Sequence, residues 1–488
     1  MMGKALGLVR EVLFAAHLGG GALADAFSFA SLMPRLILDA MFAAAISASF
    51  IPIFNTQFIE QGKKAAFELS NSFINITLMF STATAGLAWW LAPWIVGVSS
   101  LEYANLAVSL LRIMLPLMIF SCAAFSLAGV LQSLGHFNAP AAMSLAANSF
   151  VILYYLFLFD SFGVEGLAVA FLVAWSLQLL VLLPSLYKCG YKYSPLVRLN
   201  NPALRKVGAL VAPSMVFAWV LPLNLQINIF SVSHIVGGST ALNLSNTLYT
   251  ITTGVFVLSL TNVMFPRLSR EAAASQADFA NTMQTCLRGL LYLLIPLSLF
   301  MSSQAQIIVQ ILFEHGEFTP EASRMTADVL TILSLGMVGF GAQTLLSRGC
   351  FAMQDGKTPL IAALVAVSSN AVISVGLVQS LGVPATALAS TVAMTLCAVL
   401  IFSVLKRKNK DIWNKKSTKD IIKMAAASVI SITPFLALGV VPLNSLIAQL
   451  ITLTICGTAA LAIYITATYA AGVQESRLII RFIKSKIR

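Results

Sequence analysis

Charged side chains interrupt the apolar N-terminal part of this sequence and could bind an anion there. Lys4, Arg10 and Glu11 fall in one sector of a predicted first helix, at about 100° per residue. Arg35 and Asp39 follow in the second apolar segment. The three cations outnumber the two carboxylates, and a guanidinium fork matches the oxygens of a phosphate group. The excess of positive charge predicts an anionic, phosphate-bearing substrate.

Two of these features have a second interpretation. Arg35 and Asp39 stand four residues apart on one helix face, so they either contribute to the substrate site or neutralise each other as a structural ion pair. Asp25 opens the second apolar segment, where it either belongs to the substrate site or caps its own helix. The sequence leaves both pairs of interpretations open.

A second group of polar residues is uncharged and lies in later apolar segments. Such side chains could coordinate sugar hydroxyls or a small cation, although polar contacts between membrane helices are an alternative use for them. The candidates for a polar cavity are Asn224, Asn228, Asn246, Thr247 and Asn370.

The elements that would position these side chains are membrane helices. Of 488 residues, 58% are hydrophobic and 10% charged, with a mean hydropathy of +0.88. A soluble domain carries about 25% charged residues and could not bury so much apolar surface. We therefore expect an all-α polytopic membrane protein with about fourteen spans. These are residues 3–18, 25–54, 69–98, 103–133, 139–160, 164–186, 207–236, 240–265, 282–312, 323–352, 358–379, 383–405, 420–441 and 445–471.

The distribution of charge between the predicted loops indicates the orientation. One side holds basic loops, represented by Lys63, Lys192 and Lys415, whereas the other holds acids such as Glu102 and Glu317. The positive-inside rule then predicts that both termini are cytoplasmic. The net charge of +12 is explained by basic loops facing anionic lipid, which leaves no reason to expect nucleic acid as a partner.

An internal duplication is visible in the spacing of prolines and glycines. Pro140 precedes Gly163 by 23 residues, and Pro359 precedes Gly382 by the same interval, 219 residues later. Six spans per repeat give two lobes of the same membrane orientation, as in transporters built from parallel repeats. The expected division is an N-terminal lobe at residues 1–186, a C-terminal lobe at 187–405, and two added spans with a basic tail at 406–488.

No catalytic motif accompanies these spans. The sequence contains no P-loop, no zinc-protease motif, no serine-hydrolase elbow and no dinucleotide fingerprint. Its six cysteines are scattered without metal-ligand spacing and are interpreted as apolar fillers within helices. We therefore expect a transporter that is not an enzyme, without a catalytic residue, cofactor or metal site, and energised by an ion gradient or the membrane potential.

Several sequence blocks resemble the MviN/MurJ family of lipid II flippases. They are Gly7-Leu8-Val9-Arg10-Glu11, Ala24-Asp25-Ala26-Phe27, Phe50-Ile51-Pro52-Ile53-Phe54, Leu312-Phe313-Glu314-His315-Gly316-Glu317-Phe318-Thr319 and Gln354-Asp355-Gly356-Lys357-Thr358-Pro359. The similarity extends from residue 3 to the tail. The family lies in the multidrug/oligosaccharidyl-lipid/polysaccharide exporter superfamily and moves the undecaprenyl-pyrophosphate-linked precursor of peptidoglycan outward, a step in cell wall biogenesis and cell shape.

The resemblance also implies roles for individual residues. Arg10 matches the arginine of the family's first span, Glu11 the acid after it, and Asp25 the aspartate of the following loop. Lys4 replaces a second arginine, and the basic pair of the second span is here Leu38-Asp39, with Arg35 one turn earlier. Thr247 stands where the family has an arginine in span 8, and about a dozen residues of the first span are expected before Met1.

Two other functions remain open at this stage. The chain could export another polyprenyl-linked oligosaccharide or an organic cation, although a cation exporter should show unpaired acids in its cavity. It could also be a degenerate scaffold that recruits cell-wall synthesis proteins, because two of the family's arginines are lost. We expect lipid II as the substrate, membrane lipids and a coupling ion as further partners, and spans 13 and 14 as a groove for the polyprenyl tail.

Overall fold

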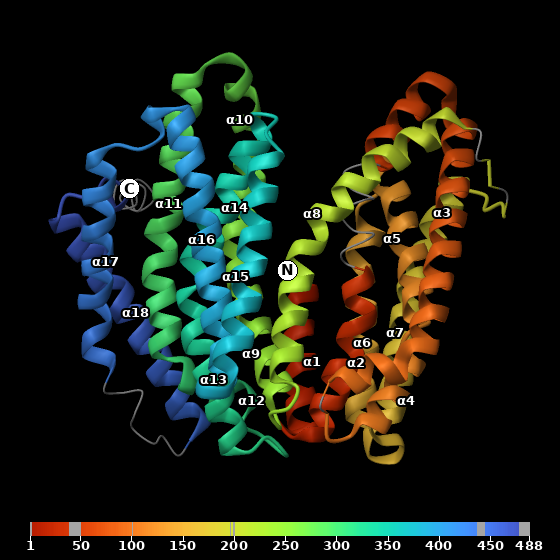
Figure 1. Cartoon of the computed structure of the whole chain (residues 1–488), viewed down its shortest axis with the longest axis horizontal. Coiled ribbons are helices and arrows are strands. Elements are labelled where there is room, and N and C mark those ends of the chain that lie inside the picture. Colours follow the sequence, from red (N-terminus) through yellow and green to blue (C-terminus); the bar gives the residue numbers. More distant parts are fainter. Residues whose placement is uncertain are drawn as a thin grey trace. The chain divides into compact units, whose positions relative to one another are not determined.

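The computed structural model describes residues 2–38, 50–99, 101–195, 197–198, 201–436 and 445–477, and this part of the chain contains helices and no strand (Figure 1). The helices are α1 (Met2–Leu18), α2 (Ala22–Leu38), α3 (Ile51–Val98), α4 (Ala104–Met114), α5 (Leu117–Ser133), α6 (Asn138–Phe157), α7 (Phe159–Lys188), α8 (Pro202–Val232), α9 (Gly238–Thr253), α10 (Ser259–Ala274), α11 (Gln276–Ser303), α12 (Ala305–Phe313), α13 (Pro320–Leu335), α14 (Met337–Ala352), α15 (Lys357–Leu381), α16 (Pro384–Lys408), α17 (Lys415–Leu436) and α18 (Leu446–Ala470). A π-helical turn, Gly254–Leu258, joins α9 to α10, and a 3₁₀ turn, Lys410–Ile412, precedes α17.

The prediction of an all-helical membrane protein is confirmed. Within the described ranges, nine helical segments are long and apolar enough to cross a membrane, and a tenth arises if α13 and α14, bent by 42°, form one broken span. The four other expected spans overlap α1, α2, α8 and α17, and the parts of two of them at residues 39–49 and 437–441 lie outside the described residues. The total of fourteen spans therefore remains a prediction.

Two expected boundaries differ from the structure. The loop expected between residues 54 and 69 is helical, because α3 begins at Ile51 and is interrupted only at Gly62, whose φ of 83° a side chain would disfavour. The span expected at 103–133 is one membrane-length segment, Ala104–Ser133, as predicted, but it consists of two helices, α4 and α5, that meet at Pro116, which cannot donate a backbone hydrogen bond. Breaks of this kind depend on one or two residues, so the average hydropathy of the segment does not register them.

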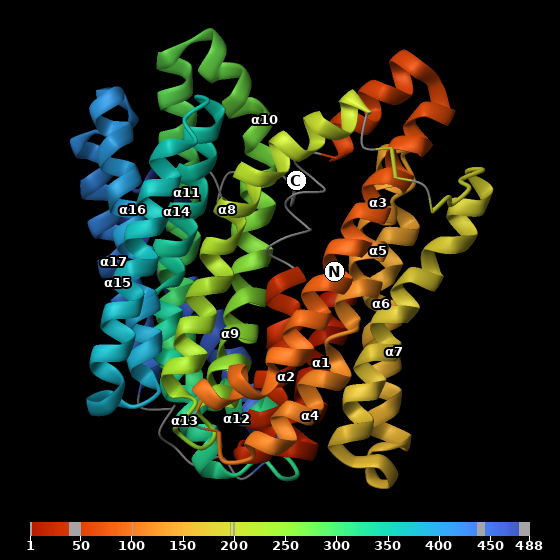
Figure 2. The same ribbon diagram turned by 45° about the vertical axis from the view of Figure 1, so that its right-hand side comes forward.

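The backbone supports the internal duplication. Gly163 joins the two parts of one helical hairpin with φ 58° and ψ −150°, and Gly382 ends α15 with φ 65° and ψ −149°. Preceding each hairpin, the chain turns through matching hydrogen bonds, from His136 N–H to the carbonyl of Leu131 and from Asp355 N–H to the carbonyl of Cys350. In each repeat two helices then run side by side, α6 with α7 and α15 with α16 (Figures 1 and 2).

The chain forms two compact units. The first comprises Met1–Thr240 together with Gly316–Phe318, and the second comprises Ala241–His315 with Thr319–Arg488. In the first unit α3 packs against α5, and α1 packs against α6. In the second unit α14 and α16 pack together, and α17 lies between α11 and α18. The division into lobes at residues 186 and 405 remains a prediction.

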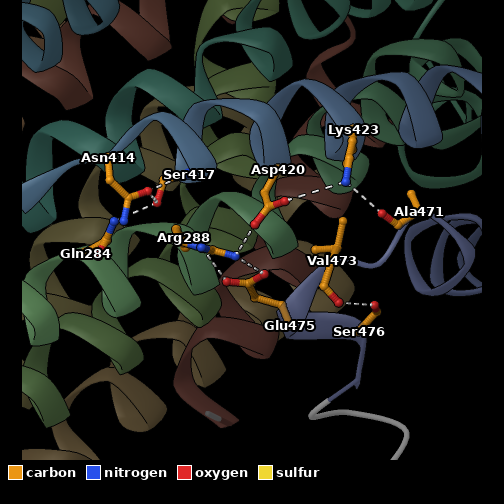
Figure 3. Close-up of polar contacts among 10 residues, drawn as sticks. All are labelled: Gln284, Arg288, Asn414, Ser417, Asp420, Lys423, Ala471, Val473, Glu475 and Ser476. Atoms are coloured by element: carbon orange, nitrogen blue, oxygen red, sulfur yellow. Dashed lines mark hydrogen bonds and ion pairs between the residues drawn. The ribbon is translucent and has the colours of Figure 1, made fainter.

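A buried ionic network attaches the two added helices to the second unit (Figure 3). Arg288 on α11 is 5% exposed and donates hydrogen bonds to Asp420 on α17, at 2.8 Å, and to both carboxylate oxygens of Glu475, at 2.8 and 2.9 Å. Lys423 lies 4.0 Å from Asp420 and donates to the carbonyl of Ala471. Two cations thus balance the two acids, and this pairing offsets the free-energy cost of removing the charges from water.

Candidate functional site

The candidate anion site is built on α1, which lies close against α6. A Cβ atom added to Gly3 would meet the hydroxyl oxygen of Ser144 at 2.2 Å, so this position accepts only glycine without a shift. One turn later Gly7 faces Asn148 at an ordinary contact distance of 3.9 Å. The two glycines let the helices approach and bring Asn148 next to the arginine one turn further along α1.

Arg10 is held by three different partners. One guanidinium nitrogen donates to the side-chain oxygen of Asn148 at 3.1 Å, and another donates to Glu11. The guanidinium carbon also lies 5.4 Å from the ring centroid of Phe171 on α7, within the range of a cation–π contact. Arg10 is 8% exposed and Glu11 7%, so the pair is nearly enclosed in the first unit. An incoming phosphate would have to replace one of these partners.

Lys4 differs from Arg10 in its surroundings. It lies on α1 with its side chain exposed, two turns before Glu11. The structure therefore brings Arg10 and Glu11 together as a buried pair, whereas the Lys4 side chain is exposed. Its ammonium group remains available to a ligand at the surface of α1.

Asp25 joins two helices that are far apart in the sequence. Its carboxylate accepts hydrogen bonds from the N–H of Gly237 at 2.6 Å and from the N–H and the hydroxyl of Thr240, both at 2.8 Å. These donors lie at the start of α9, where a helix N-terminus favours a negative charge. Asp25 is 2% exposed and lies within the first turn of α2, which begins at Ala22, and the printed hydrogen bonds of its carboxylate cap α9.

A second link lies at the adjacent end of α1. Glu317 N–H donates to the carbonyl of Ala16 at 2.9 Å. A Cβ atom on Gly316 would come within 2.3 Å of that carbonyl oxygen, and one on Gly19 within 2.6 Å of the Glu317 oxygen. Both glycines also have positive φ, of 60° and 70°. These requirements give a physical reason for glycine in the block Leu312–Thr319.

The other predicted site residues are dispersed. Asp39 lies outside the described residues, and for Arg35 the structure describes the backbone of α2 only. Asn224 and Asn228 are buried on α8 in the first unit. In the second unit Asn246 and Thr247 are half-buried on α9, and Asn370 is fully buried on α15. Because two of these residues belong to the first unit and three to the second, a cavity formed by all five remains a prediction.

Sequence reasoning missed three functional neighbours. Asn148 and Phe171 hold Arg10, and Thr240 holds Asp25. An amide inside an apolar run could have identified Asn148, because such groups need a partner within the membrane. Arg288 was not predicted as a buried ionic residue either, although an arginine within the ninth expected span indicates that carboxylates are buried near it.

Comparison with solved structures defines the class of fold. The chain superposes on a multidrug resistance MATE family transporter of the MOP superfamily, in an inward-facing conformation, with a TM-score of 0.70 and 13% identity over 84% of this chain and 95% of the other. At that identity the likeness shows the fold alone, which is that of the MOP-superfamily transporters.

The sequence comparisons are more specific. The profile of the family described as "Lipid II flippase MurJ" matches residues 14–462, so the chain belongs to this family. A probable lipid II flippase MurJ of Rhizobium tropici is 27% identical over 84% of this chain and 79% of its own length. A lipid II flippase MurJ in an inward closed conformation has a TM-score of 0.81 and 22% identity, covering 100% of this chain and 98% of the other.

Proposed function

We propose that this protein is a flippase that moves lipid II, the undecaprenyl-pyrophosphate-linked peptidoglycan precursor, from the inner to the outer leaflet. The observation that carries the proposal is the family match across residues 14–462. The buried guanidinium of Arg10 on α1 supports it, because it is a cation of the kind that could bind a pyrophosphate. The activity is transport, and it makes or breaks no covalent bond.

The substrate site of this proposal is centred on Arg10. The pyrophosphate displaces Glu11 or Asn148 from the guanidinium, and exposed Lys4 supplies a second cation. Arg35 and Asp39 complete the site, and the polar residues Asn224, Asn228, Asn246, Thr247 and Asn370 face the sugar and peptide portion of the substrate. An arginine that exchanges an internal carboxylate for a phosphate stays paired itself, and the displaced Glu11 carboxylate then has to find another partner or solvent.

Alternating access is the proposed mechanism. Residues 237–240 and 316–317 belong to the predicted C-terminal lobe, yet they bond to Asp25 and to Ala16 of the N-terminal helices. A rocking motion of the two halves has to release these hydrogen bonds in each cycle. Asp25 therefore acts in the proposal as a reversible cap of α9, in addition to any contact with substrate.

The proposed setting is the bacterial inner membrane, with both termini in the cytoplasm. The membrane potential or a coupling ion drives the cycle, and cell-wall synthesis proteins consume the exported precursor. Lysines and arginines in the predicted cytoplasmic loops support this orientation.

Complementation tests the function. The chain is expressed in cells whose own lipid II flippase is depleted, and lipid II reaching the outer leaflet is measured by its cleavage with an externally added enzyme. We expect growth and outer-leaflet lipid II to be restored. The matched control carries Arg10→Ala and Glu11→Ala, which removes the guanidinium without leaving an unpaired buried acid. Normal membrane levels of the parent chain with neither growth nor outward movement of lipid II would overturn the proposal.

A further inference from the structure

An apolar groove lies on the first unit, away from α1 and α2. It encloses about 600 Å³ between α3, α5 and α7 and the segment that follows α7. Its lining side chains are aliphatic or aromatic, among them Ile74 on α3, Leu127 on α5 and Leu183 on α7. Leu183 is 46% exposed, whereas Ile74 and Leu127 are buried, so the groove opens at the surface and is closed at its base.

One wall of the groove is fixed by a ladder of hydrogen bonds. The side-chain amide of Asn71 on α3 donates to the carbonyl of Lys192 at 3.0 Å, and that of Asn75 donates to the carbonyl of Ser194 at 2.8 Å. In return the hydroxyls of Tyr191 and Tyr193 donate to the oxygens of the same two amides. Because each tyrosine hydroxyl is bonded to α3, the rings present carbon surface to the groove.

Cations surround the end of the groove at which these tyrosines lie. Lys188 and Lys192 are exposed on the segment that forms the wall. Lys63 at the start of the straight part of α3 is within 5.6 Å of the Phe67 ring centroid, and that ring lies 5.1 Å from Tyr191. Of the two acids near Lys63 in sequence, Glu68 is already paired with Arg198, and Glu60 is exposed on the helical part that precedes the break at Gly62. The lysines therefore leave a positive rim around an apolar interior.

We propose that this groove binds an anionic glycerophospholipid, with an acyl chain between α3, α5 and α7 and the phosphate at Lys63, Lys188 and Lys192. Basic pockets between membrane helices bind anionic headgroups, and the volume lies in the range of about 300–1,000 Å³ typical of ligand sites. The bound lipid is distinct from the transported substrate, because α1 and α2, which carry Arg10 and Asp25, contribute no lining residue. The inference does not depend on the proposed function.

Native mass spectrometry of the full chain in detergent tests the proposal, with dioleoylphosphatidylglycerol and dioleoylphosphatidylcholine as probes. We expect retention of phosphatidylglycerol in preference to phosphatidylcholine. The variant Lys63→Gln/Lys192→Gln should lose that preference, by about fivefold in affinity for each lysine removed. The matched control Lys415→Gln/Lys416→Gln removes two exposed lysines elsewhere and should bind as the parent does.

Variants that fill the groove test whether the acyl chain of the lipid binds there. Ala123→Phe, at a lining position of α5, should lower retention of both lipids, whereas Ala83→Phe on the exposed face of α3 should not. If Ala123→Phe does not fold, Leu183→Trp narrows the groove from its exposed edge, and a photoreactive phosphatidylglycerol should crosslink to α5 and α7 of the parent. Unchanged lipid retention in the lysine and groove-filling variants would overturn the proposal. So would displacement of phosphatidylglycerol by undecaprenyl phosphate, which would assign the groove to a polyprenyl chain.

Discussion

Arg10, the proposed phosphate ligand, is also held in an internal network of contacts. Its guanidinium is neutralised by Glu11, oriented by Asn148 and covered by Phe171. The buried guanidinium is stable without a ligand because its charge is paired. Each of its partners can nevertheless be replaced by a ligand while the other two remain in place. A phosphate can take the position of the carboxylate and keep the guanidinium paired. The fork geometry, rather than charge alone, should therefore decide transport.

Arg10→Lys separates these contributions. The ammonium group keeps the charge opposite Glu11 but loses the two-pronged geometry, so we expect the thermal stability to stay near that of the parent while lipid II transport falls by about tenfold. Transport is measured by outer-leaflet lipid II, and stability by thermal unfolding in detergent. The stable double variant Arg10→Ala/Glu11→Ala should not transport at all. Parental transport by that double variant would make Arg10 a purely structural residue.

Asp355 offers a pH-dependent test outside the membrane spans. Burial raises the pKa of its carboxyl, but hydrogen bonds from Lys408 and from the N–H and hydroxyl of Thr358 lower the pKa by more. The net result is a pKa lowered from 3.8 to about 2. Because the folded pKa is depressed, the carboxylate stabilises the fold above the unfolded pKa of 3.8, and this contribution is lost as the pH falls toward about 2. Asp355→Asn should thus lower the unfolding temperature at about pH 6. The difference from the parent should shrink steadily below about pH 4, and a pH-independent difference would contradict the assignment.

At the scale of elements, the attachment of α17 and α18 depends on a few polar contacts. Arg288 joins α11 to α17 and to Glu475 beyond α18 (Figure 3). The Tyr464 hydroxyl on α18 also donates to the carbonyl of Tyr292 on α11 at 2.9 Å. Apolar helix faces pack on each other and on lipid equally well, so burial alone fixes neither register nor angle. The buried hydrogen bonds supply that specificity.

Replacing Arg288 should destabilise this attachment. Arg288→Met leaves Asp420 and Glu475 buried together without their main counter-charge, which costs about 3–5 kcal/mol of unfolding free energy. Arg288→Met/Asp420→Leu/Glu475→Gln should recover most of that loss. The matched control is Arg267→Met, which breaks a pair with Glu271 whose arginine is 59% exposed, and it should cost at most about 1 kcal/mol. Equal losses in the two single variants, measured by denaturation in detergent, would show that the buried network has no special role.

At the scale of the whole molecule, charge asymmetry between the loops predicts the orientation. Cysteines introduced at Glu102, Glu165 and Glu317, all exposed, should react from outside intact cells with a membrane-impermeant thiol reagent. Cysteines at Lys63, Lys192 and Lys415, also exposed, should react only after the cells are opened. Labelling at Lys192 from outside would reverse the orientation and contradict the arrangement of six spans per repeat.

Much of this protein could be predicted from the sequence alone because the relevant signals are local. Long apolar runs mark the helices, and glycine or proline marks many of the turns between them. Gly163 and Gly382 each follow a proline by 23 residues, and this equal spacing predicts an internal repeat. In the structure the two glycines have nearly the same backbone angles. Arg10 and Glu11 were identified as a charged pair because they are neighbours on one helix.

Only the tertiary structure decided which partners the charged groups have. Arg10 bonds to an amide 138 residues away, Asp25 to a helix terminus 212 to 215 residues away, and Arg288 to carboxylates 132 and 187 residues away. Hydropathy shows that a buried charge needs a counter-group, but not which of many distant polar groups supplies it. That choice is made by close packing between helices, which places a few polar atoms within hydrogen-bonding distance and leaves lipid or apolar side chains around the rest.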